Sequence, residues 1–370
     1  MRLQLNQRWP LAAVAVLALA TTTTTTTVLA EPAPDQASAT VRVYADDDRL
    51  SVVTPSAHAQ GTTGALTVEV DTSLDAVSAA SVDVVTSASP TPFQERRVEA
   101  GIGLGWALSR LTTLRGGAQV SHERDYDALR LGLGAAVELG QRNTTLELRG
   151  RFGRDRARAS DDPAFAGDRT SAGLVASLTQ LVDRRTVADL TIEGDWADGW
   201  HGSPYRRVWV SDPAMPVVTG WREATPERRL ALAAALRLRR ALGERWFGTV
   251  SARGYADDWS VRSATLTVEG RRRLDDATLL GLELRGYLQD GAWFWRERQP
   301  DGATPPRYRT ADRTLGPMAT AGVQLVGERA IGGDRRVVLA LGGLALWFFD
   351  YAPQASRHAA TVTMTFVTPL

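Results

Sequence analysis

The last stretch of the chain, Ala359-Ala-Thr-Val-Thr-Met-Thr-Phe-Val367, decides the fold. Between Ala360 and Phe366, apolar side chains alternate with three threonines, so an extended backbone places each kind on one face. A terminal strand with an apolar outside and a polar inside is typical of a transmembrane β-barrel. We therefore predict an all-β, transmembrane antiparallel barrel in which this strand closes the wall by pairing with residues 41–47.

The same alternation recurs through most of the chain from Arg97 onward. In one example, Leu280, Leu282 and Leu284 alternate with Glu283 and Arg285. The alternating stretches predict about 16 strands, an even number, as single-chain bacterial barrels require. One stretch, 229–239, is rich in Ala, Leu and Arg, and propensity alone would favour a helix there.

Short and long connections alternate between these strands, which predicts short periplasmic turns and long extracellular loops. The short turns are expected near residues 109, 141, 184, 243, 275 and 332, and the long connections at 74–93, 155–168, 197–226 and 290–312. An exported soluble β-sandwich is the alternative, because its leucine-rich faces could pack against each other.

The N-terminus indicates export. Residues 1–30 have the basic, apolar and small-residue parts of a secretory signal peptide, with cleavage expected near Ala30. A linker at 31–38 and a barrel at 39–370 would follow, in the outer membrane of a Gram-negative bacterium. Within the barrel, 74–93 lacks alternation and is interpreted as a loop or a plug in the lumen.

Composition excludes several functional classes. The formal charge is +1, from 43 basic and 42 acidic residues, which argues against a nucleic-acid partner. Without cysteine there is no disulfide, thiolate metal site or cysteine nucleophile. The four histidines have no metal-ligand spacing, so we predict no metal, no cofactor and no enzymatic activity. A hydrolase on the barrel wall is a remote alternative, because it needs Ser, His and Asp side chains brought together by folding.

Four segments near the N-terminus resemble a known family. They are Tyr44-Ala-Asp-Asp-Asp-Arg49, Val53-Thr54-Pro55, Asp75-Ala-Val-Ser-Ala-Ala-Ser-Val-Asp-Val-Val-Thr86 and Glu95-Arg96-Arg97. They resemble the N-terminal signature of the bacterial family filed as domain of unknown function 3570, strongly over 44–97 and diffusely beyond. The resemblance implies an exported, outer-membrane-type protein and assigns neither an activity nor catalytic residues.

Charged residues recur on the polar faces, which a barrel would turn toward its lumen. The candidates for lining it are Arg97, Glu99, Arg130, Glu138, Glu147, Arg149, Arg151, Asp189, Glu193, Arg237, Glu269, Glu283 and Arg285. Facing rows of opposite charge could screen solutes by charge and size. The alternative is that these groups pair with one another and only satisfy a polar interior.

Aromatic residues complete the set of candidates. Two girdles of aromatic residues are expected at the membrane interfaces. One would contain Trp106 and Trp246 at the short-turn side, with Phe366 near the C-terminus, and the other Trp196 and Trp347 at the long-loop side. Ligand or partner binding in the long loops would involve Trp200, Trp209, Trp221, Trp293 and Trp295.

The functional prediction is a porin-like channel for small polar solutes. The alternative is a plugged barrel that serves as a scaffold or docking site for another exported protein. The expected partners are outer-membrane lipid and lipopolysaccharide, the barrel assembly machinery and, in the alternative, that exported protein.

Overall fold

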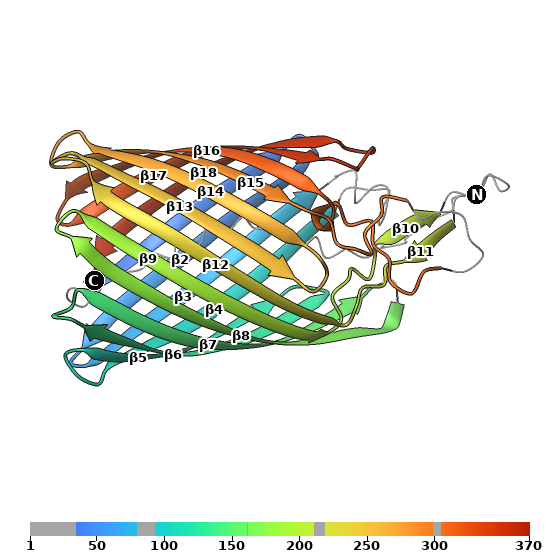
Figure 1. The fold of residues 1–370 in the computed structure, drawn as a ribbon, viewed down its shortest axis with the longest axis horizontal. Helices are drawn as coiled ribbons and strands as arrows, with labels where there is room; N and C mark the ends of the chain where they lie inside the picture. Colours follow the sequence, from blue (N-terminus) through green and yellow to red (C-terminus); the bar gives the residue numbers. More distant parts are fainter. Residues whose placement is uncertain (1–34, 80–92, 161, 211–218, 299–304) are drawn as a thin grey trace, which may run out of the picture.

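The protein folds into a closed barrel (Figure 1). The structure is a computed structural model, and it describes residues 35–79, 93–160, 162–210, 219–298 and 305–370. Sixteen antiparallel strands form one sheet in which each barrel strand pairs with the next along the chain. The last strand pairs with the first, so the wall has no free edge. The predicted fold class and strand number are confirmed.

The barrel strands are β1 (Gln36–Asp46), β2 (Leu50–Thr63), β3 (Leu66–Ala79), β4 (Phe93–Ala107), β5 (Thr112–His122), β6 (Tyr126–Leu139), β7 (Thr144–Ala159), β8 (Asp162–Asp183), β9 (Thr186–Gly199), β12 (Arg228–Ala241), β13 (Trp246–Asp257), β14 (Arg262–Arg273), β15 (Thr278–Gln289), β16 (Met318–Gly332), β17 (Arg335–Phe348) and β18 (Ser356–Pro369). Outside the barrel, β10 (Arg207–Val210) and β11 (Thr219–Arg222) form a two-stranded sheet, and η1 (Arg313–Leu315) is one turn of 3-10 helix. Among the described residues, no helix is long and apolar enough to cross a membrane.

The closing strand β18 pairs with the first strand β1, as predicted. Val41 lies opposite Met364, and the hydroxyl oxygens of Thr40 and Thr365 are 2.9 Å apart on the polar face. The helix-prone stretch 229–239 is part of β12, because pairing with β9 and β13 satisfies its backbone and its leucines share one face. Tertiary pairing therefore overrides its helix propensity.

The outer surface of the barrel is apolar. Alternate residues of the strands point outward and are exposed, including Leu133 at 76% and Leu232 at 60%. Charged residues of the same strands occupy the other face, as in β15, where Glu283 and Arg285 lie between outward leucines. A continuous apolar band around a closed barrel matches a hydrocarbon environment and not water.

We expect Met364→Arg to destabilise the barrel by about 2–4 kcal/mol, because it puts a guanidinium on the outer face of β18 amid apolar side chains. Urea unfolding of the protein folded in lipid vesicles, followed by tryptophan fluorescence, measures this. Thr365→Arg is the matched control, since it adds the same group one residue away on the inner face. Equal destabilisation by the two variants would contradict the assignment of the faces.

The two ends of the barrel differ. The C-terminus and all six predicted short turns lie at one end, the short-turn end (left in Figure 1). The predicted long connections lie at the other end, but the one at 155–168 is wrong. There β7 runs to Ala159 and β8 starts at Asp162, because the inward side chains of Asp155, Ala157 and Ala159 are buried and the hairpin extends beyond the apolar band.

Two other predicted boundaries are also corrected. Of the segment 74–93, residues 74–79 continue β3 and Phe93 begins β4; residues 80–92 lie outside the described residues. Of the predicted linker 31–38, residues 36–38 are the first residues of β1, since they pair with both β2 and β18. The predicted signal peptide at 1–30 lies outside the described part of the chain.

Candidate functional site

The thirteen predicted lumen-lining residues occupy the inner face of the wall, in alternation with the outward apolar residues. Several remain accessible to water inside the closed barrel. The side chains of Arg97, Arg149 and Arg151 are 40%, 43% and 47% exposed. These side chains keep this exposure beside their ion-pair partners, so their charged groups are accessible to solvent on the described inner wall.

Ion pairs organise the inner wall from β4 to β12, some within one strand, some between neighbouring strands and some across an intervening strand. Glu147 accepts from Arg115 at 2.9 Å and lies 3.4 Å from Arg149, whereas Arg151 binds both Glu193 and Asp195. The remaining pairs are Arg97–Glu99, Arg130–Asp155, Arg142–Glu138 and Arg239–Asp189. Structural pairing, the alternative considered for these residues, therefore accounts for many of them.

Charge is separated across the lumen. The inner face of β12–β15 carries Arg237, Arg239, Arg253, Arg271 and Arg285 against Glu269 and Glu283; we call it the basic wall. The inner face of β3–β4 carries Glu69, Asp71, Asp75 and Glu99 against Arg97; we call it the acidic wall. In the sixteen-stranded order, β3 is eight strands from β13 in either direction, so the two walls face each other.

Sequence reasoning missed most of the acidic wall. Glu69 and Asp71 alternate with Leu66, Val68 and Val70, a signal that could have identified them as inward-facing. Asp75 had no such signal, because it lies in a segment without alternation. Its carboxylate accepts a hydrogen bond from the Thr54 hydroxyl at 2.5 Å, which only strand pairing reveals.

Small, uncharged residues occupy part of the wall beside the basic wall. On β15 and β16, Arg285 lies opposite Gly322, and along β17 and β18 Gly342 lies opposite Thr361. A Cβ atom at Gly342 would be 2.4 Å from the Thr361 hydroxyl oxygen, so Thr361 would have to shift if a side chain replaced this glycine.

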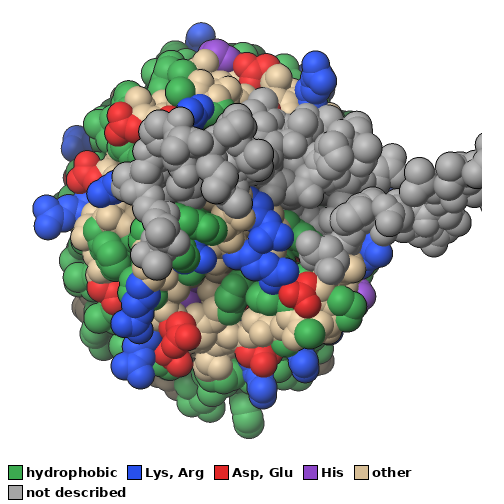
Figure 2. All heavy atoms as spheres, turned by 90° about the vertical axis from the view of Figure 1, so that its right-hand side faces the viewer, with side chains coloured by type: hydrophobic (Ala, Val, Ile, Leu, Met, Phe, Trp, Pro, Cys, Tyr) green, Lys and Arg blue, Asp and Glu red, His purple; other side chains and the backbone are tan. Residues whose placement is uncertain are grey.

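The other end of the barrel is covered by a cap. We use this term for the described residues of the β9–β12 and β15–β16 connections, 200–210, 219–227, 290–298 and 305–317. Part of the cap forms an apolar core with the wall: Phe294 and Trp295 pack with Trp259 of the β13–β14 turn and with inward Leu346 and Phe348 of β17. Figure 2 looks onto this end and shows charged side chains of both signs around its rim.

Buried carboxylates join the two halves of the cap. Glu223 accepts hydrogen bonds from Ser203 N at 2.6 Å and from the Thr310 hydroxyl, and Arg206 lies 2.7 Å from Asp312. Burial raises the pKa of Glu223, although Arg206 opposes this effect. For Asp312, burial is outweighed by Arg206 and by hydrogen bonds from Thr314, so its pKa is lowered.

Further contacts fasten the cap to the barrel at two turns. Arg313 lies 2.9 Å from Asp48 in the β1–β2 turn, and both groups are buried. At the β5–β6 turn, the Tyr205 hydroxyl donates to Asp125 at 2.6 Å. Burial, followed by this hydrogen bond, raises the pKa of Tyr205. The acidic triplet at 46–48 binds Arg357, His358 and Arg313.

The cap is expected to loosen as the pH falls from about 6.5 to about 4. Burial lowers the pKa of His201 to about 4, because its ring packs at 5.4 Å against Trp259 and its Nε2 atom is buried without a partner in the described structure. Since the folded-state pKa lies below the unfolded value of about 6.5, the stabilisation is present above that value and is lost as the pH falls through the folded pKa.

Protease cleavage of the cap in the folded barrel, measured across this pH range, tests the expectation. His201→Gln should remove most of the change between pH 6.5 and 4, because glutamine does not titrate. An exposed histidine, His122, provides the matched control as His122→Gln. A pH profile identical in wild type and His201→Gln would show that another group is responsible.

The five predicted girdle residues are exposed on the outer face, Trp106, Trp246 and Phe366 toward the short-turn end and Trp196 and Trp347 toward the cap. The Arg272 guanidinium lies 5.1 Å from the Trp246 ring, an arrangement that suits a membrane interface. Whether they contact lipid remains a prediction.

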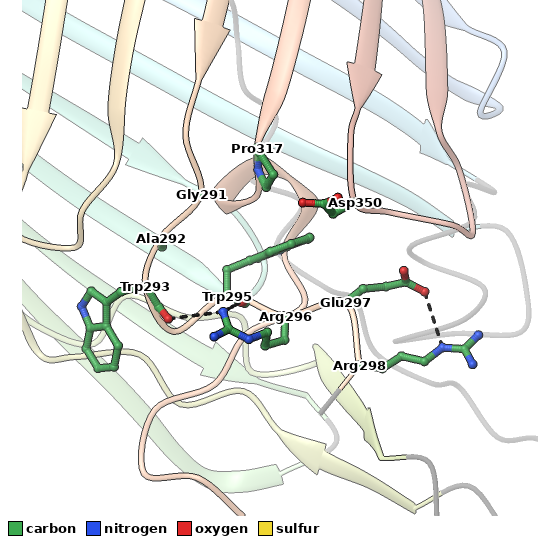
Figure 3. Close-up of a pocket in the computed structure, with 9 residues that line it drawn as sticks. All are labelled: Gly291, Ala292, Trp293, Trp295, Arg296, Glu297, Arg298, Pro317 and Asp350. Atoms are coloured by element: carbon green, nitrogen blue, oxygen red, sulfur yellow. Dashed lines mark hydrogen bonds and ion pairs between the residues drawn. The ribbon is translucent and has the colours of Figure 1, made fainter. Parts of the chain in front are cut away.

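The loop aromatics differ in their surroundings. Trp200 packs on Phe165, Trp221 is half-buried in β11, and the side chain of Trp209 lies outside what the structure describes. Trp295 is only 6% exposed and belongs to the core of the cap, whereas Trp293 is 50% exposed. Both line an open pocket of about 600 Å³ with Arg296, Glu297 and Arg298 (Figure 3).

The charged groups of this pocket bind one another and the backbone. The Arg296 guanidinium donates to the Trp295 carbonyl at 2.6 Å, and Arg298 lies 3.5 Å from Glu297 (Figure 3). In the described ranges, no group of three or more His, Asp or Glu side chains could hold a metal ion. Compared with this pocket, the inner wall of the barrel therefore offers more charged side chains that are accessible.

Comparison with known proteins supports the fold. A family model described as "Protein of unknown function (DUF3570)" matches residues 147–339, just over half of the 370 residues. This match agrees with the family that residues 44–97 resemble, although it covers a different part of the chain. No curated protein matches the sequence.

Solved structures with similar folds are outer-membrane proteins. A bacterial polysaccharide outer membrane secretin has a TM-score of 0.50 at 7% identity, over 92% of this chain and 100% of that one. The siderophore receptor PirA from Pseudomonas aeruginosa has a TM-score of 0.44 at 12% identity, and the match covers 85% of this chain and 57% of PirA. The toluene transporter TodX from Pseudomonas putida has a TM-score of 0.43 at 11% identity, and the match covers 92% of this chain and 90% of TodX.

These likenesses concern the fold alone. The chain spans 57% of the length of PirA. The closed sixteen-stranded architecture and the likeness to the secretin identify an outer-membrane-type barrel fold.

Proposed function

Because the chain belongs to the DUF3570 family, whose function is unknown, we propose from its own geometry that it is an outer-membrane channel for small polar solutes. The observation that carries the proposal is the inner wall. Its arginine side chains are 40–47% exposed within a closed barrel, so charged groups line a hydrated lumen. A barrel of 16 strands is wide enough for an aqueous channel.

The separation of charge supports solute selection in this channel. The basic wall on β12–β15 faces the acidic wall on β3–β4, so a solute between them experiences a field across its path. At low dielectric, such a field is stronger than in bulk water and favours polar over apolar solutes.

Conductance of the purified, folded protein in planar lipid bilayers tests the proposal. We expect discrete current steps, because each inserted barrel adds one hydrated path for ions. The control is the same preparation after heat denaturation, which removes the folded barrel. Insertion verified by heat-modifiable gel migration, without current steps at either polarity, would overturn the proposed function.

Docking of another exported protein at the cap is a second candidate function. It is supported by the construction of the cap, whose buried ion pairs hold two long connections in one arrangement and leave Trp293 exposed beside Arg298. The plugged form of this hypothesis concerns the predicted segment 74–93, of which residues 80–92 lie outside the described residues, and their deletion should raise the conductance. An unchanged conductance after the deletion would rule out the plugged form of the hypothesis.

The remaining assignments follow from this placement. We propose that the signal peptide at 1–30 directs export in a Gram-negative bacterium and that the barrel assembly machinery inserts the chain. Outer-membrane lipid and lipopolysaccharide would then contact the apolar band and the girdle residues.

A further inference from the structure

Three adjacent strands align a serine, a histidine and an aspartate in one row on the inner wall. Ser38 of β1 lies directly opposite His58 of β2, and His58 lies directly opposite Asp71 of β3. All three occupy inward positions, since the alternate residues of these strands form the apolar outer face. We propose that they form a hydrolase site that cleaves small esters in the lumen.

The contact between His58 and Asp71 has the arrangement required of a catalytic base and the carboxylate that positions it. His58 Nδ1 lies 2.7 Å from Asp71 Oδ1. In an imidazole ring the two nitrogens point in nearly opposite directions, so this contact turns Nε2 away from β3. Because β1 lies on the other side of β2, Nε2 is directed to the side of the histidine on which Ser38 lies.

Ser38 is within reach of that nitrogen. Directly opposed residues of antiparallel strands have Cβ atoms about 4.5–5.5 Å apart, a separation that a serine hydroxyl and an imidazole can bridge. The described structure gives the Ser38 hydroxyl no side-chain hydrogen bond, either to His58 or to a competing partner. Contacts between nucleophile and base often become short only when substrate is bound.

Two other histidine–aspartate contacts provide an internal comparison. His122 lies 2.5 Å from Asp127, and His358 lies 3.0 Å from Asp47. The residue opposite His122 on β4 is Val98, and the residue opposite His358 on β17 is Ala345, so neither has a serine there. Among the three described pairs, only the one in the lumen is completed by a nucleophile.

The chemistry balances with water as the second reactant. The Ser38 oxygen attacks the ester carbonyl while its proton passes to His58 Nε2, and the alcohol then leaves with that proton. Water, deprotonated by His58, next attacks the acyl group on Ser38 and releases the carboxylic acid, and the proton returns to Ser38. Asp71 stabilises the imidazolium in both steps.

The surrounding side chains indicate the substrate class. Gln36, two residues from Ser38 on the same face, offers an amide to the oxyanion, whereas the Thr40 hydroxyl lies 2.9 Å from the Thr365 hydroxyl. Glu69 lies on the same face of β3, two residues from Asp71, and disfavours anions. The site therefore suits short esters that are neutral or cationic, and the lumen excludes bulky lipids.

Labelling of the full-length folded barrel with a fluorophosphonate, which reacts with activated serines, tests the site. We expect the adduct at Ser38, located by peptide mass spectrometry, and hydrolysis of p-nitrophenyl acetate that Ser38→Ala abolishes. His58→Asn should lower the labelling rate by about a hundredfold, the size of a general-base contribution. Asp71→Asn should lower it less, with partial recovery in Asp71→Glu.

Matched controls separate activation from simple exposure. Ser251→Ala removes an inward serine of β13 on the opposite wall, and His122→Asn removes the histidine of a pair without a serine; neither should change the labelling. Folding of every variant is checked by heat-modifiable migration. Absence of an adduct at Ser38 in the folded protein, or equal labelling in His58→Asn, would overturn the proposal. Channel conductance is measured separately, so its failure leaves this result intact.

Discussion

Arg313→Ala is expected to release the cap from the barrel. Arg313 and Asp48 are 4% and 3% exposed, their charged atoms are 2.9 Å apart, and the guanidinium also lies 5.0 Å from the Phe348 ring. Removal of the cation takes the guanidinium partner away from the buried Asp48 carboxylate, which costs about 3–5 kcal/mol. If the cap opens as one unit, cleavage of its connections by protease in the folded protein should accelerate by about a hundredfold or more.

Two variants distinguish loss of the ion pair from other effects. Arg307→Ala is the control, because its exposed guanidinium lies over Tyr308 at 4.9 Å and contributes about 0.5–1 kcal/mol. In the second, Asp48→Leu combined with Arg313→Met replaces both charges by apolar groups and should restore most of the protection. If the cap of folded Arg313→Ala were cleaved at the same rate as that of the wild type, contacts other than this ion pair would hold the cap.

Reversal of charge on the basic wall is expected to shift ion selectivity toward cations. In the double variant Arg253→Glu and Arg285→Glu, two inward cations become anions near Glu193, Glu269 and Glu283. We expect the ratio of potassium to chloride permeability, from the reversal potential under a salt gradient, to rise several-fold. The shift should shrink from 0.1 M to 1 M salt, as the screening length falls from about 10 Å to about 3 Å.

The outer face supplies the matched control for this experiment. Arg262→Glu makes the same change on β14 at an exposed position outside the lumen and should leave the ratio near the wild-type value. Glu69→Arg on the acidic wall should shift the ratio in the opposite direction. If Arg262→Glu changed selectivity as much as the lumen pair, the current would be governed by surface charge and not by the wall.

Side-chain alternation was sufficient to predict the faces of the strands, because a period of two is a local property of an extended chain. In β18 it identified the outward Met364 and the inward Thr365, and repetition of the pattern predicted the closed barrel of 16 strands. The same pattern identified the inward charges such as Glu283 and Arg285 as a class.

Strand ends were predicted less well where the strands leave the apolar band. In β7, the outward positions beyond Phe152 are Arg154, Arg156 and Arg158, so the apolar half of the alternation stops while hydrogen bonding to β8 continues. The sequence pattern therefore ends before the strand does. The continuation of β3 through residues 74–79 was missed for the same reason, because small and polar side chains occupy both faces there.

The sequence alone determined that this protein is a barrel with an apolar outside and a charged inside, since each strand carries that information in its own residues. Only the tertiary structure decided which charges meet. Arg151 binds Glu193 from 42 residues away, and the basic and acidic walls face each other because of the circular order of the strands. Ser38, His58 and Asp71 likewise form one row through strand register, which depends on pairing between strands and is not encoded in any one of them.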